Sequence, residues 1–401
     1  NAVTVKYDAN GNEIWAARYS EGLHTSIHGI RIIVDENSNV FVAGTFISND
    51  VHDCILLKYD ANGNLLWKRT YNGTGNGYDD ATALGISPDM NSVYMGAFLY
   101  EAVGGYNFSI LNFNTDGSLN WLSSYKGPGN AAEIIYDLTV DKYGFIYACG
   151  TGESKQFQRD ILSAKFDASG NILWVNRYDG FSHGNDWSCC LKLDRENNVY
   201  LAGGVVGVSA HNDASVIKYN SGGEFQWIAT FNGQNNWHDC CQGLDFDENL
   251  NVYMSGRTCL NGNEESDDIF TIKLNKNGTK LWTKIYDGPY NNADYSSNLI
   301  YNKVSKKVFT LGHSYSNATK YDVILINYKE KNSSYTSDNS LKTNTNYKTA
   351  LTNYPNPFNP VTQIQFTLAN DDFVKLSVYD LSGRLIKNLT EGYKASGNYQ
   401  I

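Results

Sequence analysis

Short apolar runs separated by polar turns follow one another through residues 1–328. One period contains an apolar run over 30–35, a second over 39–44, a third over 53–59 and a fourth over 64–71. Apolar and polar positions alternate within these runs, as expected for half-buried strands. The Asn-rich and Asn-Gly turns between them favour the positive φ angles of tight hairpins. Each period therefore predicts four antiparallel strands.

The phrase from Lys58 to Trp67, KYDANGNLLW, recurs along the chain with small changes. Its final tryptophan returns at intervals of 52, 54, 53, 53 and 55 residues, at Trp15, Trp67, Trp121, Trp174, Trp227 and Trp282. A constant period in this range indicates a repeat architecture. Four antiparallel strands per period are typical of a β-propeller blade. The fold class is thus all-β, with the least aromatic run innermost and the tryptophan run outermost in each blade.

The number of blades follows from the strands at the two ends of the repeat. Residues 3–18 supply only the third and fourth strands of a blade, five complete blades follow, and 297–328 supply the first three strands of another. We therefore expect six to seven blades. The chain begins and ends inside a motif, so we interpret it as a fragment at both ends. Preceding residues that complete the ring would remove its open edges and would give seven blades.

The composition changes after the repeat. Residues 329–353 are rich in Ser, Thr, Asn and Lys, which is typical of a linker. Residues 354–401 hold three of the six prolines and several strand-like runs. We expect three parts: a propeller over 1–328, a polar linker over 329–353 and a partial Ig-like β-sandwich over 354–401.

Two resemblances follow from these motifs. The repeat resembles that of seven-bladed propellers in secreted bacterial proteins. The tail resembles the type A C-terminal sorting domain of the type IX secretion system. The tail's matching residues are Pro355, Asn356, Pro357, Phe358, Asn359, Pro360, Tyr379, Asp380, Gly383 and Arg384. This resemblance implies export across the outer membrane of a Bacteroidetes-type bacterium, followed by release or surface attachment, with the secretion machinery as a partner.

Charge and hydropathy narrow the classes of partner. The formal net charge is −10 and the sequence pI is about 5.2. An acidic chain of this kind argues against nucleic acid and against an anionic membrane surface as partners. No apolar run approaches the roughly 18 residues that a transmembrane helix needs. Carbohydrate and protein remain as the candidate classes of ligand.

Two sets of aspartates repeat with the blades, and we assign both to structure. The Asp- and Asn-rich turns lack the Gly and the bidentate Glu of a calcium-binding loop, so we interpret them as hairpins. A second aspartate precedes the third strand of most blades and is expected to bond loop amides. It recurs as Asp53, Asp160, Asp213, Asp268 and Asp322, with Asn107 in its place once. No metal site or cofactor is predicted.

Residues that interrupt the repeat are better candidates for function. They lie in the long connections of each blade, which a four-stranded meander collects on one edge; we call this edge the long-loop face. Two off-register tryptophans lie there in successive crossovers, and all seven histidines lie on that side or at its margin. The candidate ligand-binding residues are Trp187, Trp237, His183, His238, Asp186, Asp239 and Tyr78. Indoles beside polar groups suit stacking on a sugar or a peptide side chain. The alternative is that long loops gather such residues without binding anything.

The seven cysteines show one pattern, two vicinal pairs at the same position of successive blades. These are Cys189 with Cys190, and Cys240 with Cys241. Since neighbouring strand residues point to opposite faces, one sulfur of each pair can face the next blade. A disulfide is plausible there in an exported protein. The alternative is that the strands are too far apart for a disulfide and the cysteines are buried apolar thiols.

The sequence contains no catalytic motif. It lacks G-x-S-x-G, H-E-x-x-H and a Gly-rich phosphate loop. The first hypothesis is an exported, non-enzymatic propeller that binds carbohydrate or protein at the long-loop face. The second is an extracellular hydrolase or lyase acting on polysaccharide with acid and His groups at the channel mouth. The third is a purely structural surface protein.

Overall fold

The computed structural model describes most of the repeat and the strands of the tail. The described ranges are 2–22, 25–48, 51–102, 105–127, 132–153, 158–207, 211–233, 236–259, 266–290, 292–316, 320–329, 350–354, 363–368, 372–379, 385–395 and 397–401. Contacts divide the chain into two compact units, Asn1–Lys331 and Asn332–Ile401. The expected linker over 329–353 stays a prediction, because 330–349 lie outside the described ranges.

The first unit contains five four-stranded antiparallel sheets, preceded by a two-stranded sheet and followed by a three-stranded one. The two-stranded sheet pairs β1 (Ala2–Tyr7) with β2 (Glu13–Tyr19). The four-stranded sheets are β3 (Thr25–Val34), β4 (Val40–Ser48), β5 (Val51–Tyr59) and β6 (Leu65–Tyr71); β7 (Asp80–Ile86), β8 (Ser92–Glu101), β9 (Gly105–Asn114) and β10 (Leu119–Tyr125); β11 (Glu133–Val140), β12 (Ile146–Glu153), β13 (Arg159–Phe166) and β14 (Ile172–Tyr178); β15 (Trp187–Leu193), β16 (Val199–Val206), β17 (Asn212–Tyr219) and β18 (Phe225–Phe231); and β19 (Asp239–Phe246), β20 (Val252–Cys259), β21 (Asp267–Leu274) and β22 (Lys280–Tyr286). The last sheet has β23 (Tyr295–Asn302), β24 (Lys307–Ser316) and β25 (Lys320–Lys329).

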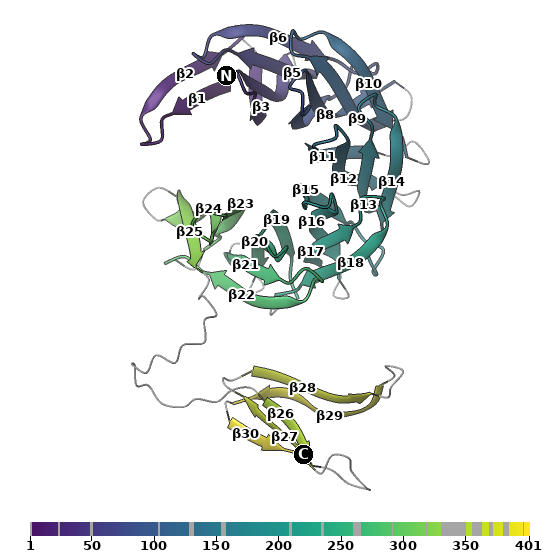
Figure 1. The fold of residues 1–401 in the computed structure, drawn as a ribbon, viewed down its shortest axis with the longest axis vertical. Coiled ribbons are helices and arrows are strands. Elements are labelled where there is room, and N and C mark those ends of the chain that lie inside the picture. The colour runs from purple at the N-terminus through teal and green to yellow at the C-terminus, as the bar shows by residue number, and fades with distance from the viewer. Residues whose placement is uncertain are drawn as a thin grey trace. The chain divides into compact units, whose positions relative to one another are not determined.

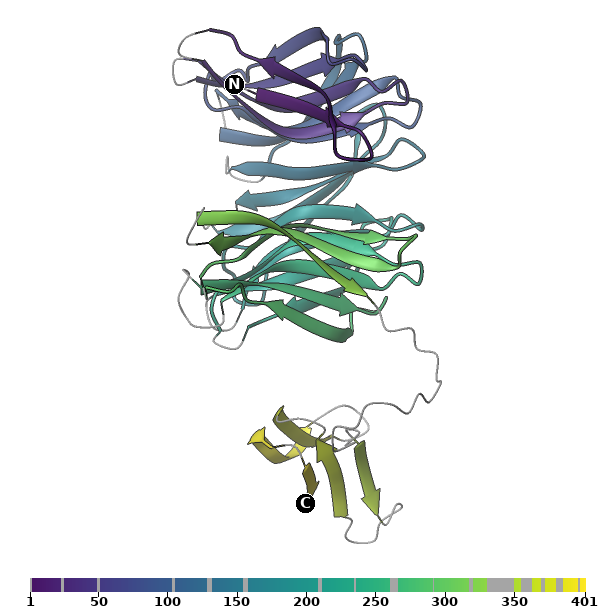
Figure 2. The ribbon, with the colours of Figure 1, turned by 90° about the vertical axis from the view of Figure 1, so that its left-hand side faces the viewer.

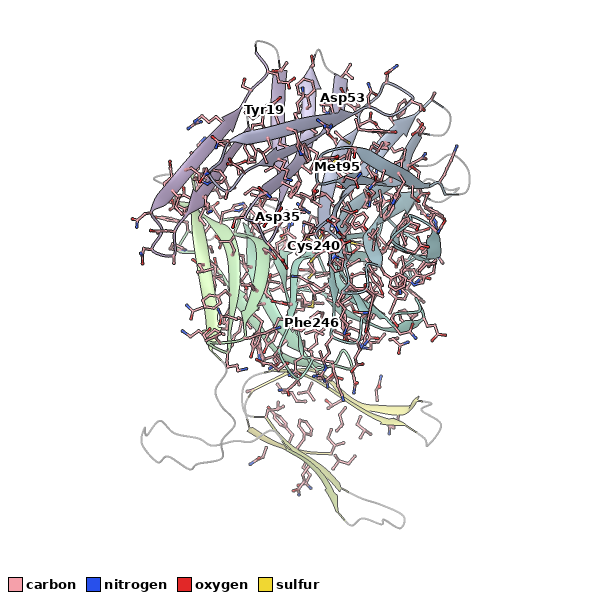
Figure 3. All side chains as sticks on the ribbon, turned by 45° about the horizontal axis from the view of Figure 1, so that its top comes forward. Tyr19, Asp35, Asp53, Met95, Cys240 and Phe246 are labelled. Atoms are coloured by element: carbon pink, nitrogen blue, oxygen red, sulfur yellow. The ribbon has the colours of Figure 1, made fainter. Side chains whose placement is uncertain are left out.

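The sheets follow one another around a common axis, which confirms the β-propeller fold (Figure 1). The first strand of each complete sheet is innermost and contacts the first strand of the next, and the tryptophan strand is on the outer rim. Cys240 therefore lies on an inner strand, β19, and Asp35 follows the inner strand β3 (Figure 3). In the side view the strand ends form two opposite edges, of which one carries the hairpin turns (Figure 2). The long-loop face is the other edge.

Tight-turn chemistry explains why these residues form hairpins. In the turn after β5, the Asp60 carboxylate accepts the N–H groups of Asn62 and Asn64, and Gly63 has a φ of 84°. The same arrangement recurs at Asp8 and Asp167. The hairpin interpretation of the Asp-rich turns is confirmed, because their carboxylates are occupied by backbone amides of the turn.

Aromatic side chains carry the packing between successive sheets. The Trp67 indole packs against the buried cluster that includes Phe41 and donates its N–H to the Thr115 carbonyl of the next hairpin at 3.1 Å. Inside each four-stranded sheet, a buried aromatic residue lies near the start of the second strand, as Tyr147, Tyr200 and Tyr253 do. Burying such rings contributes roughly 2–3 kcal/mol each.

The second unit is also made of strands. One sheet has the order β26 (Ala350–Tyr354), β27 (Gln363–Leu368) and β30 (Gly397–Gln400), and the other pairs β28 (Asp372–Tyr379) with β29 (Leu385–Lys394). Phe366 stacks on Tyr399 with ring centroids 5.0 Å apart. Two small antiparallel sheets are what a partial sandwich needs, and the Ig-like assignment remains a prediction. Within the described parts of both units, no helix is long and apolar enough to cross a membrane.

Candidate functional site

Four crossovers, the segments that lead from an outermost strand to the next innermost strand, are each braced by a buried aspartate: Asp79, Asp186, Asp239 and Asp294. Asp186 accepts the Gly180 N–H and the Val206 N–H, and it is fully buried. Asp79 does the same with Gly73 and Tyr100. Asp239, 1% exposed, accepts the N–H of Gly233. Asp186 and Asp239 therefore hold the crossovers together, and Asp186 offers no surface to a ligand.

His183 belongs to the turn of its crossover. Its φ is 50°, and Asn76 and Asn236 occupy the same position of other crossovers with φ values of 47° and 51°. The imidazole Nδ1 lies 2.6 Å from the Asp179 carboxylate, which raises the pKa of His183 through this hydrogen bond and through charge attraction. His183 is exposed, so it remains a contact candidate at the rim.

The crossover before β19 gathers three rings on the long-loop face. The Trp237 indole stacks on His211, with centroids 4.5 Å apart and an interplanar angle of 29°. His211 Nδ1 lies 3.2 Å from His238 Nε2, and His238 Nδ1 lies 3.2 Å from the Asn212 side-chain oxygen. The four residues come from two connections that are separate in sequence. We call them the His–Trp cluster.

Two hollows border this cluster and share Asn212 and His238. The first, of about 420 Å³, is also lined by Gln158, Ser182, His183, Gly184, Asn185 and Val206. The second, of about 280 Å³, is also lined by Trp187, Asp239, Cys240, Arg257 and Asp267. Arg257 is held in place because it donates to Asp267 at 3.2 Å and to the Cys240 sulfur at 3.3 Å. The second hollow thus combines an indole with fixed donors and acceptors.

The two off-register tryptophans occupy different positions. Trp187 is the first residue of β15 and its ring lies over Gly204, where a Cβ would come within 3.0 Å of the indole. Trp237 lies two residues before Asp239. In the described part of the chain the two indoles make no ring contact with each other. His238, rather than a second indole, is the neighbour that they share, because it contacts Trp237 and lines the hollow of Trp187.

Tyr78 lies in a different crossover. Its ring meets His52 edge-on, with centroids 4.4 Å apart, and it is 49% exposed. The Asp79 N–H donates to the His52 carbonyl, just as the Asp294 N–H donates to the Asp267 carbonyl. Tyr78 directly precedes the brace Asp79 as His238 directly precedes the brace Asp239, so the two residues occupy corresponding positions of two blades. The structure therefore does not bring Tyr78 into the His–Trp cluster.

Buried carboxylates repeat close to the long-loop face. Burial, and then the charge of Asp239, raises the pKa of Asp213 to about 6. Burial also raises the pKa of Glu133 to about 7, against the opposing effect of its partner Arg177. The corresponding acids Asp53, Asp79 and Asp160 have pKa values raised first by burial. Because these acids recur at fixed blade positions, their raised pKa values do not single out a catalytic pair.

The cysteine pairs form no disulfide. None of the seven cysteines is part of a disulfide. Cys189 Sγ instead lies 3.1 Å from the Cys241 carbonyl oxygen of the neighbouring inner strand, and burial raises the pKa of Cys189 and Cys241. Cys190 packs against a buried cluster that contains Cys241, and Cys240 lies beside Arg257. In place of the disulfide predicted as plausible, Cys240 and Cys241 are buried thiols and Cys189 and Cys190 are half-buried ones.

The sorting motif falls mostly outside the described residues. Pro355, Asn356, Pro357, Phe358, Asn359, Pro360, Asp380, Gly383 and Arg384 lie outside them, and Tyr379 is the last residue of β28.

The sequence does not predict three of the site residues, which are Asn212, Arg257 and Asp267. For His211 it predicts only a position on the long-loop side, together with the other six histidines. Asn212 and Asp267 each precede the repeated aspartate of the third strand, at Asp213 and Asp268. That register was a usable signal. Only the three-dimensional structure shows that this position contacts the next crossover.

Comparison with known proteins identifies the tail. Residues 352–401 match the family described as Secretion system C-terminal sorting domain. This protein is exported. The domain marks proteins that the type IX secretion system delivers to the cell surface or beyond. The prediction of a type IX sorting tail is confirmed.

One solved structure supports the propeller fold. The chain is similar to dihydro-heme d1 dehydrogenase NirN, a β-propeller protein, with 14% identity, a TM-score of 0.51, and coverage of 99% of this chain and 72% of that one. It is also similar to a protein of unknown function from Dyadobacter fermentans, with 11% identity, a TM-score of 0.43, and coverage of 76% and 97%. The likeness to NirN concerns the fold alone, and nothing is argued from the second structure. Curated protein sequences yield no match to the chain.

Proposed function

We propose that this exported propeller is a binding module that takes a carbohydrate chain at the His–Trp cluster. The observation that carries the proposal is the 280 Å³ hollow, in which the Trp187 indole faces the same space as Asn212, His238, Arg257 and Asp267. A sugar ring offers an apolar face for an indole and hydroxyl groups for such donors and acceptors.

The neighbouring hollow extends the site. Both hollows are lined by Asn212 and His238, so a ligand that fills one continues naturally into the other. Their volumes, about 280 and 420 Å³, suit one sugar unit or slightly more in each. We therefore expect an oligosaccharide of two or more units to bind better than a monosaccharide. A protein ligand that inserts an aromatic or polar side chain is the other ligand class that suits this chemistry.

The test is titration calorimetry of the full chain against panels of oligosaccharides and extracellular peptides. Trp187→Ala and His238→Ala are expected to weaken binding at least about tenfold, which corresponds to about 1.4 kcal/mol. Tyr78→Ala is the matched control, because Tyr78 occupies the position of His238 in another blade. Equal affinity of all three variants and the wild type would contradict the proposal. Sugar release that His238→Ala abolishes would favour the hydrolase or lyase alternative.

A further inference from the structure

Three aspartates from separate parts of the last complete blade meet beside the crossover that leads to β23. Asp268 lies in β21, Asp287 follows β22, and Asp294 precedes β23. One carboxylate oxygen of each lies within 4.8 Å of the others. Asp294 and Asp268 are 0% and 4% exposed, whereas Asp287 is exposed. Two buried carboxylates therefore have a third at their solvent side.

The buried Asp294 carboxylate is only half satisfied. Its Oδ2 accepts the Gly288 N–H, but its Oδ1 has no hydrogen-bond partner. In the corresponding Asp79 and Asp186, Oδ1 accepts an N–H of the next blade at 2.6 and 2.7 Å. An unmet buried acceptor destabilises the fold, and a charged one does so more strongly. Asp239 Oδ1 is also unpartnered, but its crossover has Asn232 at the position of Asp287 and therefore lacks the third carboxylate of the Asp294 cluster.

A second unpartnered oxygen lies beside it. Ser314, in β24, is 4% exposed and its Oγ has no hydrogen-bond partner. A Cβ placed on Gly288 would lie 2.5 Å from Ser314 Oγ and 2.8 Å from each Asp294 oxygen. The hydroxyl and the carboxylate therefore converge on the same glycine, and neither satisfies the other.

An earlier blade shows how the same acidic positions are neutralised by side chains. There the three acids are Asp160, Asp179 and Asp186. Arg177 Nη1 lies 3.5 Å from Asp160, and His183 Nδ1 lies 2.6 Å from Asp179. Aligned on the tyrosines Tyr178 and Tyr286, the position of Arg177 is held by Ile285. The blade of β19–β22 therefore has the three acids but no arginine at the position of Arg177.

We infer that Asp268, Asp287 and Asp294, with the Ser314 hydroxyl beside them, bind a calcium ion. All four groups offer oxygen, which calcium prefers, whereas zinc favours nitrogen and sulfur. Calcium accepts irregular coordination completed by water, and magnesium demands a near-ideal octahedron. An exported protein meets free calcium outside the cell.

The ion would join two sheets. Asp268 and Asp287 belong to the blade of β19–β22, and Ser314 belongs to the sheet of β23–β25. Calcium at this place would fasten the last sheet to its neighbour. It would do so independently of any ligand at the His–Trp cluster.

The test uses the full chain freed of metal with a chelator and titrated with calcium chloride. We expect one calcium ion per chain, with a Kd of about 0.1–1 mM as in extracellular modules. A Tm about 2–5 °C higher is expected at 10 mM calcium, and a smaller effect of magnesium. Asp287→Asn removes an exposed ligand, should fold, and is expected to weaken calcium binding at least about tenfold.

Asp179→Asn is the matched control, because it makes the same change in the blade that has Arg177 and His183. It is expected to leave calcium binding unchanged. A wild type whose heat signal and Tm do not respond to calcium would overturn the inference. An Asp287→Asn variant that binds calcium as the wild type does would also overturn it.

Discussion

The indole of Trp174 lies against Gly223, the turn glycine of the following blade. Gly223 has a φ of 86°, and a Cβ there would come within 2.9 Å of the Trp174 ring. The indole N–H also donates to the Ser221 carbonyl of the same turn, at 3.4 Å. The pair explains why the Asn-Gly…Trp phrase repeats as a unit. The tryptophan of one blade packs where the next blade has a glycine, because a side chain at that position would collide with the indole.

Gly223→Ala should destabilise the propeller by about 2–4 kcal/mol, since a left-handed backbone costs about 1–2 kcal/mol and overpacking costs more. Gly11→Ala is the control, because Gly11 has a similar φ of 84° and nothing within 4 Å of the added Cβ. It should lose only the backbone contribution. Urea denaturation measures both losses, and equal losses would show that the indole contact contributes nothing.

Asp186→Ala should destabilise the propeller by about 2–3 kcal/mol, because the N–H groups of Gly180 and Val206 lose a buried, charged acceptor. Phe181→Ala in the same crossover is the control, because Phe181 is 88% exposed. Its unfolding free energy should change by less than about 0.5 kcal/mol. If Asp186→Ala kept its stability and lost ligand affinity instead, Asp186 would be a binding residue rather than a brace.

Stability should fall as pH rises from about 4 to about 6, through the titration of Asp213. The folded-state pKa of Asp213 is about 6, raised above its ordinary value by burial and then by Asp239. The folded protein therefore holds a proton that the unfolded chain has released, and it loses about 2 kcal/mol across this window. Asp213→Asn should flatten the decline, measured by urea denaturation at several pH values.

Asp116→Asn is the control for the pH series. Asp116 is an exposed turn residue whose pKa is lowered by its hydrogen bonds to Ser118. Its stabilising contribution is present above its ordinary pKa and is lost as pH falls, which is the opposite sign. The variant should therefore leave the decline between pH 4 and 6 in place. A decline that survives in Asp213→Asn would assign it to other acids, such as Glu133.

Removal of residues 352–401 should prevent delivery to the cell surface, because this segment matches the sorting domain. In a bacterium with type IX secretion, fractionation should find the shortened protein inside the outer membrane with its propeller folded. A fusion of residues 332–401 to a reporter, which includes the whole second compact unit, should be exported. Surface delivery of the shortened protein would show that the signal lies elsewhere.

The sequence by itself determined the fold of the repeat and the destination of the protein. Trp67 and Gly63 recur every 53 residues or so because each blade forms the same hairpin and covers the same turn of its neighbour. The residues that a hairpin requires lie close together in the sequence, so the repeat can be recognised there. The sorting motif is likewise a contiguous stretch around Pro355 and Phe358. Sequence reasoning could therefore find both.

Only the tertiary structure decided which polar residues are available to a ligand. Asp186 and His238 look alike in sequence, as polar residues of successive crossovers, yet one is a buried brace and the other lines two hollows. The difference between the two depends on residues from different strands and blades that lie close together. His211 stacks on Trp237, for example, and a carboxylate oxygen of Asp268 lies within 4.8 Å of one of Asp294. Their distances depend on how neighbouring sheets pack, and because these contacts do not recur in every blade they leave no periodic signal in the chain.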